Sequence, residues 1–271
     1  MPKIIAFDPT YNPKLSMIVN AFAKGCGAEV HPLGEYRECD IAIIFGLYKK
    51  AFLPTLPKKE IMEKHKGKRL LVIESAFVRR GEYWQVGWGG QAGHADFNYN
   101  GQSLDRWEKL NMEVQPWQIR NGPIVVCGQV PRDTTIQDTD HHKWCRDTVN
   151  FFRNHNIDVK FRPHPRDKRN IADYKIPPEY LDLGKLPRTL SIAKCLVTYN
   201  STSGVDGVIA GIPVVSMNMG SFAWEVSSHE LLGPYITPDR TRWLAKLGYA
   251  QWNIQEILSG QAWSHISNGV W

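Results

Sequence analysis

The chain has 271 residues, of which 42% are hydrophobic and 22% charged, a composition typical of a globular protein with a packed core. Its apolar runs are shorter than the ~18 residues that a membrane helix needs, and its start has no signal-peptide pattern, so we expect a cytoplasmic protein. The five cysteines are scattered without CxxC spacing, which argues against a disulfide framework and against a cysteine-based metal site.

The net charge of +6 is concentrated in residues 49–80. Ten basic and three acidic residues give this segment a charge of +7 and leave −1 for the rest of the chain. A concentrated positive surface attracts polyanions such as nucleic acids. The alternative is a solvated lysine face on a helix that keeps the protein soluble.

The first half of the chain alternates strand and helix patterns. Helices are predicted after Pro13, where apolar residues recur at helical spacing, and at residues 58–66. Short apolar runs predict strands at residues 3–7, 28–31, 41–45 and 69–73. This order indicates a parallel sheet covered by helices.

Residues 77–117 interrupt the alternation with many glycines and several large aromatic residues. Such a long irregular stretch is usually functional or disordered, and its aromatic content argues against disorder. We therefore expect an ordered loop region that lines a cleft, followed by a domain junction near residues 117–122.

Strand and helix patterns resume in the second half. Strands are predicted at residues 123–128, 158–161, 195–198 and 213–217. Helices are predicted at residues 140–153, 205–210, 242–247 and 253–258. The tryptophans of the last two helices are expected in the core, because they lie on apolar faces.

Two of these strands end in polar groups that suit a phosphate or diphosphate. Arg162 and His164 stand among prolines that orient them, and both side chains can donate to phosphate oxygens. Ser201, Thr202 and Ser203 stand where a strand turns into a helix, and helix N-termini bind anions. The alternative for Arg162 and His164 is an exposed basic turn, and the alternative for the three hydroxyl residues is simple helix capping.

Three further residues complete this candidate donor-binding site. Gly128 and Gln129 follow the first strand of the second half, where a glycine allows close approach of a ligand to the backbone. Asp206 lies in the first turn of the helix at 205–210, where a carboxylate can bind ribose hydroxyls or simply stabilise the helix dipole.

The segment 205–215, VDGVIAGIPVV, resembles the acidic-helix-Gly-x-Pro-Val-Val segment of GT-B glycosyltransferases. The His-Pro and Ser/Thr pair is similar to motifs of bacterial sialyltransferases and capsule-synthesis transferases, where they hold the donor phosphate. The resemblance covers about residues 122–220 and implies that His164, Ser201 and Thr202 bind phosphate, and that Asp206 takes the place of a ribose-binding glutamate.

This resemblance implies an α/β fold with two facing Rossmann-like domains and parallel sheets. Residues 1–120 would form the acceptor-side domain and residues 121–240 the nucleotide-sugar-binding domain. The helices of residues 241–271 would cross back to pack on the first domain.

We therefore predict a glycosyltransferase that uses a nucleotide sugar as co-substrate, without a metal or other cofactor. With its Gly/Trp-rich loop and its C-terminal Gln251-Trp252-Asn253, the chain also resembles small phage-encoded glycosyltransferase-like proteins. This resemblance, the basic segment and the interleaved aromatic residues favour a hydroxymethylated pyrimidine in double-stranded DNA as acceptor. The residues expected to contact it are Lys66, Lys68, Arg69, Arg79, Arg80, Trp84 and Trp88. The alternatives are a surface or capsular glycan as acceptor, and an inert nucleotide- or DNA-binding module.

An inverting transfer needs a base near the acceptor hydroxyl, usually a carboxylate. The candidates are Glu74 at the end of a predicted strand, Asp96 in the glycine-rich region and Asp105 before a tryptophan. A structural hydrogen bond or salt bridge is the alternative for each of them.

Overall fold

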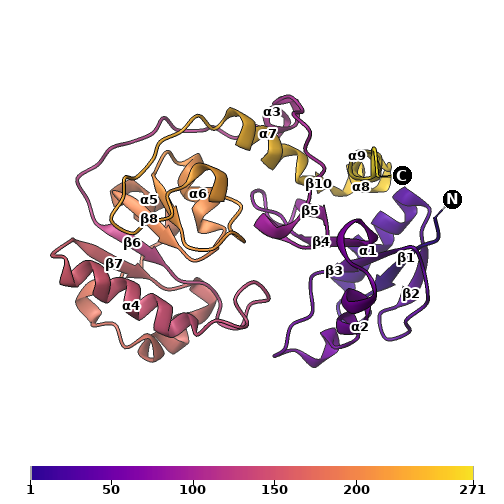
Figure 1. Ribbon diagram of the computed structural model, residues 1–271, viewed down its shortest axis with the longest axis horizontal. Helices are drawn as coiled ribbons and strands as arrows, with labels where there is room; N and C mark the ends of the chain where they lie inside the picture. Colours follow the sequence, from indigo (N-terminus) through magenta and orange to yellow (C-terminus); the bar gives the residue numbers. More distant parts are fainter. Residues whose placement is uncertain (1, 271) are drawn as a thin grey trace. The chain divides into compact units, whose positions relative to one another are not determined.

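The computed structural model describes residues 2–270, the side chains of 168–170 excepted. The chain divides into two compact units, each with its own sheet (Figure 1). The first unit comprises Met1–Asn111 and Thr241–Trp271, and the second comprises Met112–Arg240. The C-terminal segment therefore belongs to the same unit as the N-terminus.

The first unit is built on a six-stranded sheet of order β10-β5-β4-β3-β1-β2. Strands β2, β1, β3 and β4 are parallel, whereas β5 runs antiparallel to β4 and β10 antiparallel to β5. The strands are β1 (Ile4–Asp8), β2 (Glu29–Pro32), β3 (Ile41–Phe45), β4 (Leu70–Ser75), β5 (Tyr83–Trp88) and β10 (Gln251–Asn253).

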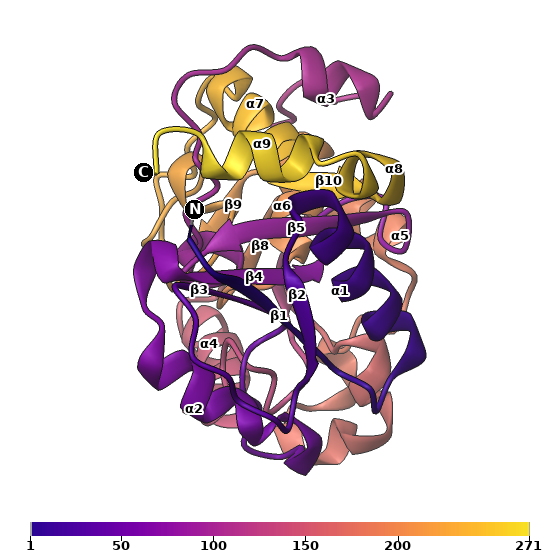
Figure 2. The ribbon, with the colours of Figure 1, turned by 90° about the vertical axis from the view of Figure 1, so that its right-hand side faces the viewer.

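Six α-helices accompany this sheet in the described residues: α1 (Pro13–Cys26), α2 (Pro57–Lys64), α3 (Asp105–Lys109), α7 (Thr241–Tyr249), α8 (Ile254–Leu258) and α9 (Gln261–Ser267). Short 3-10 helices lie at Leu53–Thr55, Gly67–Arg69 and Ala92–His94. Helix α1 begins where the Asn12 side chain accepts hydrogen bonds from the backbone of residues 14 and 15, and ends at Gly27, whose φ is 70°. Helices α8 and α9 lie beside α1 (Figure 2), and the three cover one face of the sheet.

The expectation of an irregular region at 77–117 is wrong in part, because it contains β5 and α3. Gly87 within β5 and the glycines on either side of it hid its strand pattern. Trp84 and Trp88 are only 7% and 1% exposed and belong to the core between the sheet and α1, α8 and α9. The Trp88 indole donates to the carbonyl of Ile266 at 2.7 Å, which ties β5 to α9.

The second unit has a fully parallel four-stranded sheet of order β7-β6-β8-β9. Its strands are β6 (Ile124–Cys127), β7 (Val159–Arg162), β8 (Cys195–Thr198) and β9 (Val214–Ser216). Its helices are α4 (His141–Asn154), α5 (Leu186–Ile192) and α6 (Ser203–Ile209), with 3-10 helices at Pro165–Tyr174, Pro178–Tyr180 and Trp224–Val226. The chain leaves β6 to form β7 on one side and β8 on the other, which creates a topological switch point at the carboxyl ends of β6 and β8.

The predicted α/β class with parallel sheets is confirmed for both units. Trp243 and Trp252 lie in the core as expected, at 2% and 3% exposure. No helix in the described part of the chain combines the length and apolar character that a membrane crossing requires. The sequence patterns missed β10 and α9, because a three-residue strand and a seven-residue helix are too short for a clear period.

Candidate functional site

The loops after β6, β7 and β8 gather most of the predicted donor-binding residues at one edge of the second sheet. Cys127 at the end of β6 pairs with Arg162 of β7 on one side and with Thr198 of β8 on the other. The three strands therefore end at the same level, and their following loops meet there. In open α/β sheets this is where ligands bind.

Arg162 is the most unusual residue of this edge. It is 9% exposed, and its Nε atom has no hydrogen-bond partner among the described residues. No ion pair to its guanidinium occurs in the part of the chain that the structure describes. A buried charge is costly unless it is paired, so this guanidinium suits an anion supplied by a ligand.

His164 follows Arg162 and is held in one tautomer. Its Nδ1 atom accepts a hydrogen bond from the backbone N–H of Arg166 at 3.1 Å, so in the neutral ring Nε2 carries the proton. The turn is anchored by Asp167, which is 4% exposed and accepts a 2.5 Å hydrogen bond from the Tyr174 hydroxyl. His164 is therefore presented as a hydrogen-bond donor on a fixed turn.

Hydrogen bonds between Gln129 and Asn200 connect the loops after β6 and β8. The Gln129 amide donates to Asn200 Oδ1 at 2.7 Å, and its oxygen accepts from the Asn200 backbone N–H at 3.0 Å. Through these two bonds Gln129 fixes the two loops relative to each other, while its predicted contact with the donor stays a prediction. The Gln129 backbone N–H in turn donates to His141 Nε2 at 2.8 Å, and burial lowers the pKa of that histidine to about 4.

The same network includes Asp133 and Thr135, which the sequence reasoning missed. The Thr135 hydroxyl lies 3.2 Å from Asp133 Oδ1 and 3.3 Å from Asn200 Oδ1. Asp133 is half-buried, and its Oδ1 also accepts from the backbone of Thr135 at 3.3 Å. Its position six residues after the end of a strand gave no sequence signal, yet it adds a carboxylate to this edge.

Other predicted donor residues have structural roles here. Ser201 Oγ accepts a 3.2 Å hydrogen bond from the backbone of Ser203, which is the capping alternative, while Thr202 makes no side-chain cap. Helix α6 has only seven residues, which weakens the argument for an anion at its N-terminus. At Gly128 a Cβ would lie 3.2 Å from the Phe161 ring, so packing explains that glycine.

Asp206 lies in the first turn of α6 and lines a cavity of about 360 Å³. Much of the remaining wall is apolar and comes from Leu186, Pro187 and Leu190 of α5 and Ile209 of α6. The cavity therefore combines a carboxylate with an apolar wall in the same unit as Arg162.

The three predicted catalytic carboxylates of the first unit lie in three different places. Glu74 is at the carboxyl end of β4, and its Oε1 atom accepts from the Ser75 backbone at 2.7 Å. Asp96 pairs with Trp88 beside the amino end of β4 and lies 3.7 Å from Lys68. The two are separated by about the length of β4, roughly 13 Å.

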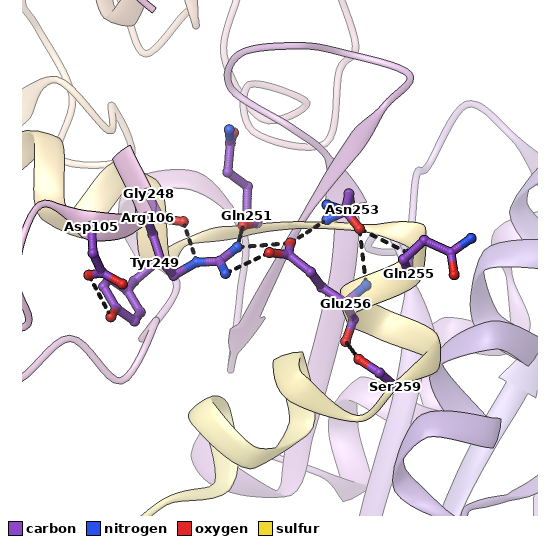
Figure 3. Close-up of polar contacts among 9 residues, drawn as sticks. All are labelled: Asp105, Arg106, Gly248, Tyr249, Gln251, Asn253, Gln255, Glu256 and Ser259. Atoms are coloured by element: carbon purple, nitrogen blue, oxygen red, sulfur yellow. Dashed lines mark hydrogen bonds and ion pairs between the residues drawn. The ribbon is translucent and has the colours of Figure 1, made fainter. Parts of the chain in front are cut away.

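Asp105 is the first residue of α3, and neighbouring hydroxyl groups, that of Tyr249 among them, donate to its carboxylate (Figure 3). It accepts from Ser103 at 2.6 Å and from the Tyr249 hydroxyl at 2.9 Å. These bonds hold the pKa of Asp105 below its ordinary value, the Ser103 bond most strongly. A carboxylate engaged in this way is a weak base, so the structural alternative holds for Asp105.

The basic segment does not form one surface. Lys66, Lys68 and Arg69 are exposed beside the amino end of β4, whereas Arg79 and Arg80 follow its carboxyl end. Arg79 is also engaged by the Leu110 carbonyl at 2.7 Å. The expectation of Trp84 and Trp88 as acceptor contacts is wrong, because both rings are buried in the core.

Two solved structures share this fold over almost the whole chain. One is the beta Kdo 2,7 transferase of Thermosulfurimonas dismutans KpsC, with a TM-score of 0.59 and 11% identity over 96% of this chain and 98% of that one. The other is the beta Kdo 2,4 transferase of the same KpsC, with a TM-score of 0.60 and 12% identity over 94% and 98%. No protein-family model and no curated protein matches the sequence.

At 11–12% identity this likeness establishes the fold alone. The chain has a Rossmann-like fold of the GT-B class, as the motifs of its second half led us to expect. The function of this fold depends on the groups gathered at its site, and here these groups lie at the carboxyl edge of the second sheet.

Proposed function

We propose that this protein is a glycosyltransferase that binds a nucleotide sugar at the carboxyl edge of its second sheet. The buried guanidinium of Arg162 is the observation that carries the proposal. Its charge has no partner in the described part of the chain, and it stands two residues from the proton-bearing Nε2 of His164. A phosphate or diphosphate supplies negative charge to the Arg162 guanidinium and acceptor oxygens to the His164 N–H.

The cavity beside Asp206 supports a nucleotide over a simple phosphate. A ribose offers hydroxyls to the carboxylate, and a base can lie against the apolar residues of α5 and α6 that line the rest of the cavity. Asp206 keeps the ribose-binding role that the resemblance implied for it.

In the proposed reaction a hydroxyl oxygen of the acceptor attacks the anomeric carbon, and the bond from that carbon to the phosphate oxygen breaks. Arg162 and His164 stabilise the charge that develops on the departing phosphate, a contribution that is typically worth about 10²–10³ in rate for each donor. The hydroxyl proton passes to a carboxylate.

Two carboxylates are candidates for this base. Glu74 keeps the strand-end position that favours it among the three predicted residues. Asp133 lies on the donor edge itself, within the network of Thr135 and Asn200. A base variant reduces turnover by about 10²–10⁴ while leaving donor binding unchanged, so comparing Glu74→Gln with Asp133→Asn identifies it.

For the acceptor we propose a glycan. Burial of Trp84 and Trp88 removes the aromatic contacts that favoured DNA, and the basic residues are spread over both ends of β4. Both solved relatives are named Kdo transferases, which also favours sugar chemistry. A hydroxymethylated DNA acceptor is distinguished by salt, because binding through several lysines weakens steeply with ionic strength.

The proposal is tested by titrating the full chain with a panel of nucleotide sugars in a calorimeter, activated Kdo included. We expect at least one to bind, and Arg162→Met to weaken it strongly. Arg188→Met is the matched control, since that side chain is 71% exposed in the same unit. Absence of any binding, or equal binding by both variants, would refute the proposal.

A further inference from the structure

The carboxyl edge of the first sheet also carries a constructed polar site. Glu74 Oε1 is held by the backbone of Ser75, and Oε2 faces Gly46, which follows β3. A Cβ at Gly46 would lie 2.9 Å from Glu74 Oε2 and 3.7 Å from Lys58 Nζ. The φ of Gly46 is +64°, which favours glycine, and a Cβ here would also displace the Glu74 carboxylate.

Lys58 supports Glu74 from the interior. It is only 2% exposed, and its ammonium donates to the carbonyl of Phe45. Burial lowers the pKa of Lys58 to about 8, although the charge of Glu74 acts in the opposite direction. Burial of the ammonium therefore outweighs the attraction of Glu74, and protonation of Lys58 costs free energy in the folded state.

An aromatic pair lies beside this carboxylate. The rings of Tyr11 and Phe52 meet edge to face at 5.6 Å, and the two residues are 37% and 43% exposed. Tyr11 follows β1 and Phe52 follows β3, and these strands run parallel to β4, so the pair lies at the edge that carries Glu74. Burial, and then the charge of Glu74, raise the pKa of Tyr11. Thr55 fixes the loop, since its hydroxyl donates to the Phe52 carbonyl at 2.8 Å.

We propose that this edge of the first sheet is a saccharide-binding site in which Glu74 accepts a sugar hydroxyl and Tyr11 and Phe52 contact the apolar face of the ring. The inference rests on the proposed function and names the class of acceptor. An exposed aromatic surface beside a fixed carboxylate matches a sugar, which has C–H faces and hydroxyl donors. Lys58 is a positioning residue whose ammonium attracts the Glu74 carboxylate on the side of Gly46.

The same edge has features that suit other ligands, and the carboxylate decides between them. Lys50 and Lys59 are exposed nearby, and Leu53 is 79% exposed. A membrane of anionic lipids or a DNA backbone is attracted by the lysines, but its phosphates are repelled by Glu74. A neutral saccharide has no such penalty.

The test uses the full chain on a printed array of bacterial oligosaccharides, with hydroxymethylcytosine-containing duplex DNA and phosphatidylglycerol vesicles assayed in parallel. We expect retention on at least one saccharide, reduced at least tenfold in Phe52→Ala and in Glu74→Gln. Met17→Ala, an exposed apolar residue of α1 in the same unit, is the matched control and retains full binding.

Lys58→Met separates positioning from folding. We expect it to unfold at a temperature no lower than the wild type, yet to bind the saccharide less well and to lose binding at a higher pH as the solution is acidified, because Glu74 then protonates more easily. Lys58→Arg, which keeps the charge, restores part of the binding. Equal binding and pH dependence in wild type and Lys58→Met would overturn the positioning role.

Other outcomes overturn the site itself. These are no retention on any saccharide, retention that Phe52→Ala and Glu74→Gln leave unchanged, or the same sensitivity shown for DNA or vesicles. Failure of the proposed function is distinguishable, because it appears as absent nucleotide-sugar binding in the calorimeter while saccharide retention persists. Arg162→Met is expected to lose the nucleotide and keep the saccharide.

Discussion

The buried ion pair between Arg106 and Glu256 is expected to be the most sensitive polar contact of the first unit (Figure 3). Arg106, on α3, is 7% exposed and donates to both oxygens of Glu256, at 2.8 and 3.0 Å. It also donates to the carbonyls of Gly248 at 3.1 Å and Gln251 at 2.9 Å, and its guanidinium lies 3.6 Å from the centre of the Trp252 ring. One side chain thus joins α3 to α7, β10 and α8.

The perturbation is Glu256→Gln, which preserves shape and removes the charge. Removing one partner of a buried ion pair typically costs 3–5 kcal/mol, because the other charge stays buried. The glutamine amide oxygen still accepts one bond from Arg106, so we expect a loss of about 3 kcal/mol. Glu256→Ala also removes the bond from the Asn253 backbone at 3.0 Å that completes the capping box, which adds about 1 kcal/mol.

The assay is urea unfolding of the full chain, monitored by tryptophan fluorescence. Trp84, Trp88 and Trp252 are buried in the first unit, so their emission reports its unfolding. The control is Glu60→Gln, which removes an exposed partner of Lys64 and is expected to change the free energy of unfolding by less than about 0.5 kcal/mol. A Glu256→Gln protein as stable as the Glu60→Gln protein would refute the reasoning.

The pH dependence provides a second check on the same pair. Burial acts to raise the pKa of Glu256, but the hydrogen bonds from Arg106 and the Asn253 backbone outweigh it and hold the pKa below its ordinary value. The stabilisation of the fold by ionised Glu256 is therefore present above the unfolded-state pKa of about 4.3 and is lost as the pH falls below it. The difference between wild type and Glu256→Gln should shrink below that pH.

Three further outcomes are expected. Arg162→Met weakens nucleotide binding by roughly 10–150-fold, the value of a hydrogen bond to a charged group of about 1.5–3 kcal/mol, and calorimetry measures it. Because burial lowers the pKa of His141 to about 4, the free energy of unfolding should fall as the pH drops from 6.5 towards 4, by at most about 3 kcal/mol. Unfolding of His141→Gln should lack this pH dependence. Gly46→Ala is destabilised by about 1–2 kcal/mol in thermal or urea unfolding, because its positive φ disfavours a side chain, and it binds the saccharide less well because a Cβ meets Glu74.

Some element boundaries followed from the sequence because their causes are local. Asn12 and Gly27 delimit α1 through their own backbone geometry, and the apolar run at Ile41–Phe45 needs no distant partner to be recognised as a buried strand. The parallel course of the strands in the second sheet likewise followed from alternating strands and helices, and it brings the ends of β6, β7 and β8 to the same edge.

Tertiary structure alone decided which groups share a site. Glu74 and Asp96 are 22 positions apart, and both were candidate bases in the sequence, Glu74 with the better position at a strand end. The antiparallel course of β5 carries Asp96 back to the amino end of β4 and leaves Glu74 at the carboxyl end. The same turn of the chain brings Trp84 and Trp88 into the core, against helices from the far end of the chain.

Asp133 and Lys58 are two residues that the sequence did not identify as parts of a site. Neither belongs to a recognisable motif, and each acquires its chemistry from neighbours distant in the chain: Asn200 beside Asp133, and Glu74 beside Lys58. Local propensity and periodicity depend on adjacent residues, so a sequence reports them directly. Burial and electrostatic partnership depend on how strands are ordered in a sheet, and only the folded chain determines that order.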